Sequence, residues 1–387
     1  MIERKIANDV RKLAASFKAV ALLGPRQSGK TTLVKSLFKE KEYVSLENPD
    51  IRNFALNDPR GFLNQFLNGA ILDEVQRVPE LFSYLQQILD ESDQPGLFIL
   101  TGSNNFLLQE SISQTLAGRI AFSYLLPFSI EELENTAWMP NNSDAAIFQG
   151  GYPPIYDQQI SPSDWLPNYI QTYVERDVRQ IKNITNLHLF DRFLRLCAGR
   201  VGQLLNLSNL AIEVGVDHKS ISSWIGILES SFIVTLLKPH HSNFNKRLVK
   251  MPKLYFYDTG LACSLLGITH PDHLKAHPLK GSLFENLIVS EMTKHHFNLN
   301  KNGNLYFWRD HTGHEVDLII DRGFELFPVE IKSGETVNED FFKGLRHWSK
   351  ISGQTNGGTI IYAGDTIQKR SDNMTVLPWK LAHTVGI

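Results

Sequence analysis

The residues with the clearest chemical signature form a phosphate-binding motif near the start of the chain. The motif follows the pattern G-x-x-x-x-G-K-[ST] and comprises Gly24, Pro25, Arg26, Gln27, Ser28, Gly29, Lys30 and Thr31, with Thr32 next. Its glycines let backbone N–H groups turn inward around phosphates at the start of a helix, where the helix dipole favours negative charge. Lys30 would reach the β- and γ-phosphates of ATP, and the hydroxyl of Thr31 would ligate Mg²⁺. The alternative is a glycine-rich turn with a chance lysine, but an apolar run before the motif and helix-forming residues after it favour nucleotide binding.

An acidic pair, Asp73 and Glu74, ends the apolar run Ala70-Ile71-Leu72. Beside a phosphate-binding loop, Asp73 would hold the Mg²⁺ through water, and Glu74 would orient or deprotonate the attacking water. Two carboxylates at the end of a strand could instead be a solvated cap. Glu74 in particular favours hydrolysis over passive binding of the nucleotide.

Further polar residues are candidates for contact with the γ-phosphate. The stretch Thr101-Gly102-Ser103-Asn104 follows a third apolar run and would lie beside that phosphate, although these residues also suit an ordinary turn. Arg119 would be an arginine finger, acting either within its own subunit or on the nucleotide of a neighbour in a homo-oligomer. Arg176 and Arg179 are weaker candidates of the same kind, with a solvated helix face as their alternative.

A second set of charged residues near the end of the chain has the spacing of a metal-dependent site. Glu330 and Lys332 share one face of a strand, and Asp317 lies on the preceding strand of the same hairpin. Carboxylates such as Asp317 and Glu330 can hold a Mg²⁺ that polarises a phosphodiester, while the lysine orients the attacking hydroxide. Glu285, an acid among apolar helix residues, would be a further metal ligand, with Glu291 as the less favoured alternative. The alternative is that Glu330 and Lys332 belong to a cross-strand surface ion pair that contributes little energy, and that Glu285 is an ordinary helix-face residue.

The middle of the chain predicts a pair of helices followed by a strand. Residues 207–217 form a helix that ends at a glycine turn, residues 218–228 form a second helix, and a strand follows at 232–237, which is typical of a winged helix. The next run, residues 238–253, would contact a nucleic-acid backbone because it lacks acids and contains the basic residues Lys238, Lys246, Arg247, Lys250 and Lys253. A protein-packing module with a solvated basic loop is the alternative.

Short apolar runs predict the strands that position these side chains. Runs without strict alternation indicate strands buried on both faces, as in a parallel sheet flanked by helices. They lie in the first part of the chain at 18–24, 42–46, 68–74 and 96–102. Residues 135–164 are rich in Asn, Ser, Pro, Gly and Gln, and we expect them to have little structure of their own.

Composition limits the class of protein. The 387 residues include 42% hydrophobic and 21% charged residues, as in an ordinary folded protein of two or three domains. The net charge of -2 excludes a uniformly basic nucleic-acid binder but not a local basic face. Two cysteines and the absence of a long apolar run favour a reducing, cytoplasmic setting without a membrane partner.

With these motifs placed, the chain resembles a prokaryotic family of AAA-like P-loop ATPases that carry a C-terminal restriction-endonuclease-like, or PD-(D/E)xK, domain of unknown function. The resemblance is carried by the segments LLGPRQSGKTTL, ILDEVQRVPEL, LTGSNNFLL, TLAGR, YVERDV, KRLVKMPKLYFYDTGLA, GSLFENLIVSEM and GHEVDLII with VEIKSG. It implies ATP and Mg²⁺ at Lys30, Thr31, Asp73 and Glu74, and a finger or sensor role for Arg119. It also implies that the nuclease core matches Glu285, Asp317, Glu330 and Lys332.

We therefore expect an α/β protein of three domains. These are an AAA-like P-loop ATPase domain with a parallel sheet at 1–135, a helical linker and winged-helix domain at 136–253, and an α/β restriction-endonuclease-like domain at 254–387. The leading hypothesis is a Mg²⁺-dependent ATPase whose nucleotide state controls a nuclease acting on nucleic acid. The alternative is a regulatory ATPase switch that binds a partner or DNA and carries an inactive nuclease-like scaffold.

Overall fold

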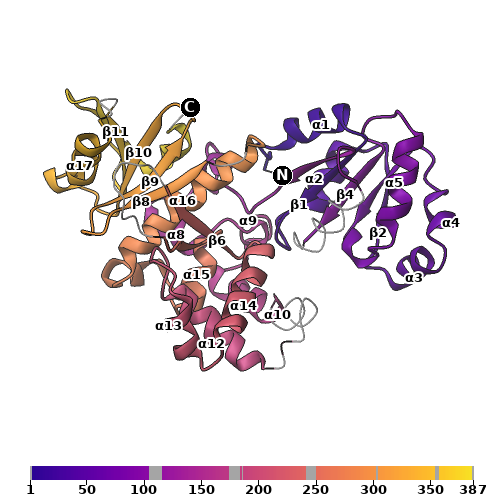
Figure 1. Ribbon diagram of the computed structural model, residues 1–387, viewed down its shortest axis with the longest axis horizontal. Helices are drawn as coiled ribbons and strands as arrows, with labels where there is room; N and C mark the ends of the chain where they lie inside the picture. Colours follow the sequence, from indigo (N-terminus) through magenta and orange to yellow (C-terminus); the bar gives the residue numbers. More distant parts are fainter. Residues whose placement is uncertain are drawn as a thin grey trace. The chain divides into compact units, whose positions relative to one another are not determined.

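The computed structural model describes residues 2–103, 116–173, 184, 186–240, 250–301, 304–353 and 357–385. The chain forms two compact units, which Figure 1 shows with the helices and strands labelled. The first unit comprises Met1–Phe128, Ser230–Phe232 and His296–Asn302, and the second comprises Ser129–Glu229, Ile233–His295 and Gly303–Ile387.

The first unit is built on a five-stranded parallel sheet with the strand order β2-β3-β4-β1-β5. Its strands are β1 (Ala19–Leu23), β2 (Glu42–Ser45), β3 (Ala70–Asp73), β4 (Phe98–Gly102) and β5 (Ile120–Tyr124). Its helices are α1 (Ala7–Ser16), α2 (Lys30–Leu37), α3 (Pro49–Asn57), α4 (Pro59–Leu63), the 3₁₀ turn η1 (Val75–Arg77) and α5 (Leu81–Glu91). The predicted parallel sheet is confirmed, because β1, β3 and β4 are buried along their whole length and pair in parallel.

Side chains on one face of this sheet pack against α1 and α2. One buried cluster contains Val10 of α1 and Val34 of α2 together with Val20, Ile71 and Ile99 of the strands. Because parallel strands end at the same edge, the residues that follow β1, β3 and β4 lie at that edge. The sheet therefore brings together three loops that the sequence separates widely.

The second unit combines a group of helices with an eight-stranded mixed sheet of order β12-β13-β11-β10-β9-β8-β6-β7. Its strands are β6 (Val234–Pro239), β7 (Lys253–Phe256), β8 (Leu305–Arg309), β9 (Glu315–Asp321), β10 (Leu326–Lys332), β11 (Gly358–Tyr362), β12 (Gln368–Lys369) and β13 (Met374–Pro378). Its α-helices are α7 (Ile130–Leu133), α8 (Ser143–Gln149), α9 (Pro153–Asp157), α10 (Pro162–Tyr173), α12 (Leu187–Ala198), α13 (Leu207–Val214), α14 (His218–Ser230), α15 (Thr259–Leu265), α16 (Lys280–Asn298) and α17 (Lys343–Ser352). Its 3₁₀ turns are η3 (Pro271–Ala276), η4 (Glu339–Phe342) and η5 (Trp379–Thr384).

The predicted helix pair of the middle segment is present. Helix α13 ends at Gly215, which has a φ of 88° and so adopts the left-handed conformation that glycine favours. Helix α14 follows, and the antiparallel pair of β6 and β7 comes next. The predicted domain boundary between residues 253 and 254 falls inside β7, and β6 also pairs with β8, so both predicted domains contribute to one sheet.

The prediction for residues 135–164 is wrong. This segment contains α8, α9 and the start of α10, and their apolar side chains Ile147, Tyr152 and Ile155 are buried. The polar residues that suggested a loop are helix caps, since the side chain of Asn142 accepts a hydrogen bond from Ala145 N and α9 begins with Pro153.

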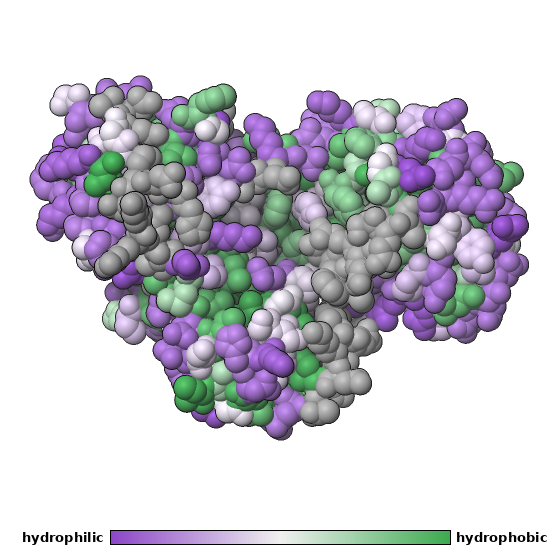
Figure 2. Space-filling view, in the orientation of Figure 1, coloured by the Kyte–Doolittle hydropathy of each residue, from purple (hydrophilic) through white to green (hydrophobic). Residues whose placement is uncertain are grey.

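Hydrophilic residues cover most of the surface around α5 and α17 on the face drawn in Figure 2. Among the described helices, none combines the length and the apolar character needed to cross a membrane.

One buried side chain of α16 bonds to the backbone of strand β7. Asn286 has no exposed surface, and its amide accepts a hydrogen bond from Phe256 N at 2.7 Å and donates one to Phe256 O at 2.8 Å. This contact fixes the position of β7 along α16. Lys253 and Tyr255 of β7 therefore lie opposite Glu285 of α16.

Asn286→Ala should lower the free energy of unfolding by roughly 2–4 kcal/mol, because it leaves two buried backbone groups without partners. Chemical denaturation followed by circular dichroism measures this change. Asn209→Ala, at an exposed position of α13, is the matched control and should not change the midpoint of the unfolding transition. Equal midpoints for the two variants would contradict the role assigned to Asn286.

Candidate functional site

The phosphate-binding motif forms the loop between β1 and α2. Gln27 and Gly29 have φ values of 62° and 93°, and this backbone conformation turns the loop around the start of α2. A Cβ atom on Gly24 would lie 2.0 Å from Leu125 O, so the loop packs too closely on the chain after β5 for any other residue at that position. The ammonium of Lys30 is buried and donates to Gly24 O at 2.9 Å and Pro25 O at 2.8 Å.

The loop fits a bound phosphate on two structural grounds. The hydroxyl oxygen of Ser28 is fully buried and has no hydrogen-bond partner within the described part of the chain. The Lys30 ammonium lies inside the loop, where it is already positioned to exchange backbone carbonyls for phosphate oxygens. Of the flanking motif residues, Arg26 pairs with Glu47 at 3.7 Å, whereas Gln27 and Thr32 are exposed.

Asp73, at the end of β3, is the centre of a hydrogen-bond network beside the loop. Its carboxylate lies 3.3 Å from the Thr31 hydroxyl and also accepts hydrogen bonds from Tyr43 Oη at 2.6 Å and from Thr101 Oγ1. Burial and the neighbouring carboxylate raise the pKa of Tyr43, which keeps its hydroxyl protonated as a donor. Thr31 and Asp73 thus face each other beside the loop, and their oxygen atoms are of the kind that Mg²⁺ prefers.

Glu74 follows Asp73 in a backbone conformation that is rare for a non-glycine residue, with a φ of 55°. This conformation turns the side chain back over the end of the sheet, where Ser103 Oγ donates to Glu74 Oε2 at 3.0 Å and Gln76 Nε2 donates to the same oxygen. The acidic pair and Ser103, which follow β3 and β4, are therefore brought together. Asn104, the other polar candidate of that stretch, lies outside the described residues.

Arg4 contacts the loop and was not identified from the sequence. Its buried guanidinium donates to Ser28 O at 2.8 Å and to Leu126 O at 2.6 Å, and it lies over the ring of Phe128. These contacts join the start of the chain to the loop and to the segment after β5. No local sequence pattern marks Arg4, because its two partners lie 24 and 122 residues away.

Arg119 lies at the opposite end of the strands from the phosphate-binding loop. It directly precedes β5, and its carbonyl accepts a hydrogen bond from Ala19 N at the start of β1, whereas the phosphate-binding loop follows the end of β1. Its guanidinium pairs with Asp90 at 3.0 Å on the surface. The prediction that Arg119 reaches nucleotide bound in its own subunit is therefore wrong, and action on a neighbouring subunit stays a prediction. Arg176 and Arg179 lie outside the described residues.

The second unit brings the predicted acid and lysine residues together. Antiparallel pairing of β9 with β10 places Asp317 beside Glu330 and Lys332. The Lys332 ammonium contacts Glu330 Oε2 and lies 3.3 Å from Asp317 Oδ2, which also accepts a hydrogen bond from Ile331 N at 2.8 Å. Lys332 therefore faces both carboxylates rather than solvent.

A second lysine, Lys253, is close enough to Asp317 to affect its charge. Its ammonium is buried, lies 2.8 Å from Glu285 Oε1 and also contacts Glu315. One oxygen each of Glu285, Glu315 and Asp317 lie within 4.8 Å of one another, as ligands of a single cation would. We call Glu285, Glu315, Asp317, Glu330, Lys253 and Lys332 the acid–lysine cluster. Glu315 was missed, although its position two residues before Asp317 puts both on one face of β9.

Burial and charge act against each other within the acid–lysine cluster. Burial raises the pKa of Glu285 despite the nearby Lys253, and burial together with Asp317 raises the pKa of Glu330. Burial would also raise the pKa of Asp317, but the Lys332 and Lys253 ammoniums hold it below its ordinary value. The pKa of Lys253 is raised, because Glu285, Asp317 and Glu315 outweigh the opposing effect of burial.

Two other predictions are corrected by the positions of charged residues. Glu291 lies apart from the acid–lysine cluster, since its carboxylate accepts hydrogen bonds from Ile130 N and Lys294 Nζ. Within the basic run 238–253, Lys238 and Lys250 are exposed, but Lys253 is buried against carboxylates and cannot contact a nucleic-acid backbone. Lys246 and Arg247 lie outside the described residues.

Comparison with protein families assigns the first unit. Residues 16–134 match the family described as AAA domain, residues 141–272 match a domain of unknown function (DUF8612), and residues 280–382 match another domain of unknown function (DUF4143). The first unit is therefore an AAA-like P-loop ATPase domain, and this family implies binding of ATP with Mg²⁺ as the usual partner ion. The restriction-endonuclease-like assignment of the last part stays a prediction.

Curated relatives extend along the whole chain. An uncharacterized protein of Mycobacterium tuberculosis is 28% identical over 391 residues, which cover 100% of this chain and 86% of that protein. An uncharacterized protein of Haemophilus influenzae is 21% identical over an alignment that covers 88% of this chain and 92% of that protein.

Solved structures resemble this one more distantly. A Walker-type ATPase of Pyrococcus abyssi aligns with a TM-score of 0.45 and 15% identity, covering 68% of this chain and 96% of its own. AMPPCP-bound DnaA from Aquifex aeolicus aligns with a TM-score of 0.29 and 14% identity, covering 58% of this chain and 85% of its own. Because both TM-scores are below 0.5, the assignment of the first unit rests on the family match and on the geometry of its loop.

Lys253→Met should destabilise the second unit by about 3–5 kcal/mol, because it leaves Glu285 and Glu315 buried without their cation. The folded-state pKa of Glu285 is already raised and should rise further without Lys253, so the variant binds protons more readily when folded. Its stability should therefore fall as the pH rises from about 5 to about 8.

Urea titrations across this pH range measure the effect. Lys343→Met is the matched control, because it removes an exposed lysine that pairs with the exposed Asp340. The role assigned to Lys253 would be contradicted if Lys253→Met lost the same unfolding free energy at every pH. It would also be contradicted if Lys253→Met lost no more than Lys343→Met.

Proposed function

We propose that this protein is a Mg²⁺-dependent ATPase that acts as a switch, in which the nucleotide bound to the first unit regulates the second unit. The observation that carries the proposal is the pair of carboxylates at the end of β3, each of which accepts a hydrogen bond from a hydroxyl group in another part of the first unit. Asp73 faces Thr31, and Glu74 accepts a hydrogen bond from Ser103.

Each of these residues has a defined task in ATP hydrolysis. Bound ATP with Mg²⁺ supplies the phosphoryl group that is transferred to water. Lys30 would neutralise the phosphates, and Thr31 with Asp73 would hold the ion. Glu74 would orient or deprotonate the attacking water, and its two hydrogen-bond donors, Gln76 and Ser103, restrict the position of its carboxylate.

Ser103 would sense the nucleotide state through Glu74. The Ser103 hydroxyl is buried and touches Glu74. A change of partner at Glu74 when the γ-phosphate is lost would move this contact.

Lys30→Ala should abolish binding of ATP, whereas Glu74→Gln should keep binding but lower kcat by about 100-fold or more, because it removes the base. Equilibrium binding of a fluorescent ATP analogue and a phosphate-release assay measure the two effects. Lys39→Ala and Glu80→Gln, both at exposed positions nearby, are matched controls and should behave like the wild type. Normal turnover by Glu74→Gln would show that the catalytic base has been misassigned.

For the second unit, we propose a regulated scaffold rather than a nuclease. The observation that favours this is the buried Lys253 ammonium, which contacts Glu285 and Glu315 in the place where a metal would need them. The Lys253 ammonium already neutralises these carboxylates, and it would repel a metal ion that bound beside it. The nuclease remains the second candidate, favoured by the contact of Lys332 with both Asp317 and Glu330.

The two candidates predict different behaviour with divalent ions. The scaffold predicts no Mg²⁺- or Mn²⁺-dependent cleavage of DNA or RNA, with or without ATP, above the level of Asp317→Ala. It also predicts that these ions raise the melting temperature of Lys253→Met more than that of the wild type, because the variant frees the carboxylates. Wild-type cleavage that disappears in both Lys332→Ala and Asp317→Ala would establish the nuclease instead.

Two partners remain proposals. Nucleic acid would bind through α13, α14 and the β6–β7 pair in the manner of a winged helix, for which the exposed Lys219, Lys238 and Lys250 supply positive charge. Homo-oligomerisation would allow Arg119 to reach the nucleotide of a neighbouring subunit.

A further inference from the structure

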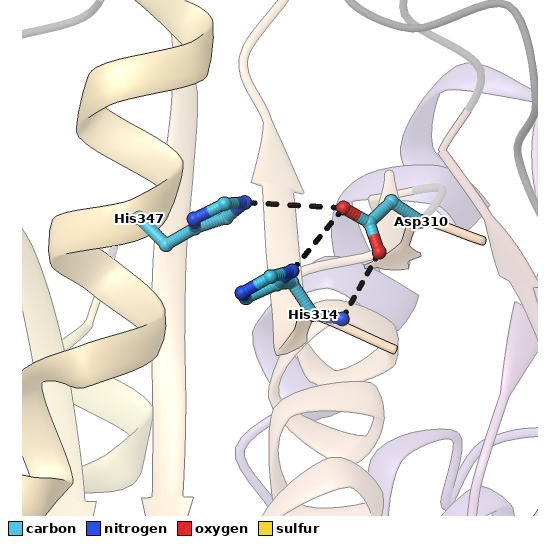
Figure 3. A group of neighbouring side chains, drawn as sticks. All are labelled: Asp310, His314 and His347. Carbon is cyan, nitrogen blue, oxygen red and sulfur yellow. Dashed lines mark hydrogen bonds and ion pairs between the residues drawn. The ribbon is translucent and has the colours of Figure 1, made fainter. Parts of the chain in front are cut away.

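A second group of potential ligands lies in the same unit, outside the acid–lysine cluster. Asp310 follows β8, His314 directly precedes β9 across a tight turn, and His347 lies on α17. One atom of each residue lies within 4.8 Å of the other two. Figure 3 shows both imidazole rings with a nitrogen directed towards the Asp310 carboxylate.

We propose that Asp310, His314 and His347 form a binding site for a divalent transition-metal ion of the Zn²⁺ class. We call these three residues the His–Asp site. Two imidazoles and one carboxylate are a donor set that suits Zn²⁺, Co²⁺ or Ni²⁺, whereas Mg²⁺ and Ca²⁺ prefer oxygen ligands alone.

The hydrogen bonds of Asp310 leave one of its oxygens directed at the histidines. Oδ1 accepts from Thr312 N at 2.8 Å, Thr312 Oγ1 at 2.7 Å and His314 N at 3.0 Å. Oδ2 lies 3.4 Å from His314 Nδ1 and 3.9 Å from His347 Nε2. The carboxylate is buried and fixed in orientation by its first oxygen, so the second is a preorganised ligand atom.

His347 contributes a buried nitrogen whose hydrogen-bonding capacity is unused. Its Nε2 has no hydrogen-bond partner within the described part of the chain and points at Asp310 across a gap of 3.9 Å. Such a buried group in a native protein calls for a partner, and an ion between the two atoms supplies it. The adjacent Trp348 is buried against Trp308, which anchors this part of α17 to the sheet.

The charge state of His347 suits a metal. Their rings are stacked with centroids 3.8 Å apart and planes 5° from parallel, so a positive charge on one ring opposes a charge on the other. Burial, and then the proximity of His314, lower the pKa of His347, although Asp310 opposes this. Neutral imidazole is the form that binds metals.

Binding would change the arrangement of the rings. A metal lies near the plane of each imidazole that binds it, so two stacked rings must turn apart to share one ion. His314 has the freedom to do this, because its side chain is 53% exposed, whereas His347 is 30% exposed. Three protein ligands leave a fourth position of a tetrahedral ion open to water or to a small anion.

Titration of the chelator-treated full chain with Zn²⁺, in competition with a chromophoric chelator, tests the site. We expect one tightly bound equivalent per chain, unaffected by a large excess of Mg²⁺. Co²⁺ should give the visible absorption of a four-coordinate ion with mixed nitrogen and oxygen ligands.

Variants distinguish this site from other ligands in the chain. His314→Ala and His347→Ala should each weaken Zn²⁺ binding by more than about tenfold, since even loss of a hydrogen-bond partner of a ligating histidine typically costs that much. His347→Phe keeps an aromatic ring over His314 and should show the same loss, which separates ligation from stacking. His311→Ala, in the same turn and exposed, is the matched control and should bind like the wild type.

Three results would overturn the proposal. Wild-type protein that binds Zn²⁺ no better than His314→Ala and His347→Phe would exclude the His–Asp site. Equal loss in His311→Ala would indicate nonspecific binding by surface histidines. Loss in Asp317→Asn with full binding in the histidine variants would move the ion to the acid–lysine cluster.

Discussion

A charged side chain that leaves water must find a partner within the protein, and this constraint shapes the sites of both units. In the first unit the buried Lys30 ammonium is held by carbonyls of its own loop, and the Asp73 carboxylate is surrounded by hydroxyl donors. In the second unit the buried Lys253 ammonium is held between Glu285 and Glu315.

The two solutions have different consequences for function. Lys30 is paired with backbone carbonyls, which are neutral, so a phosphate that offers full negative charge can replace them. Lys253 is paired with carboxylates, which are charged, so a metal would have to compete with a cation that is already present. This contrast supports our proposals that the first site binds ATP and that the acid–lysine cluster has a structural role.

The sequence predicted those features that depend on local periodicity. Apolar runs identified β1 to β4, and strand alternation placed Glu330 with Lys332 and opposite Asp317, because both signals are carried by neighbouring residues. The acidic pair was expected beside the phosphate-binding loop because it ends a buried strand, and Asp73 does face Thr31. The contact of Glu74 with Ser103 was not predicted.

The features that were missed depend on contacts distant in sequence or on one overlooked strand. Arg4 reaches Ser28 and Leu126 only because α1 packs on the sheet. Lys253 was taken for part of a basic loop, since its acidic partners, Glu285 and Glu315, lie far along the chain. Arg119 was misplaced because β5 was not recognised, and a residue that precedes a parallel strand lies at the edge away from the phosphate-binding loop.

The most direct test of the account is an experimental structure with Mg²⁺ and a non-hydrolysable ATP analogue. We expect Lys30 to leave Gly24 O and Pro25 O for the β- and γ-phosphates, Thr31 to ligate the ion with Asp73 behind it, and Glu74 to face the γ-phosphate. A nucleotide bound elsewhere, or a Lys30 ammonium that stays on the two carbonyls with the nucleotide present, would contradict it.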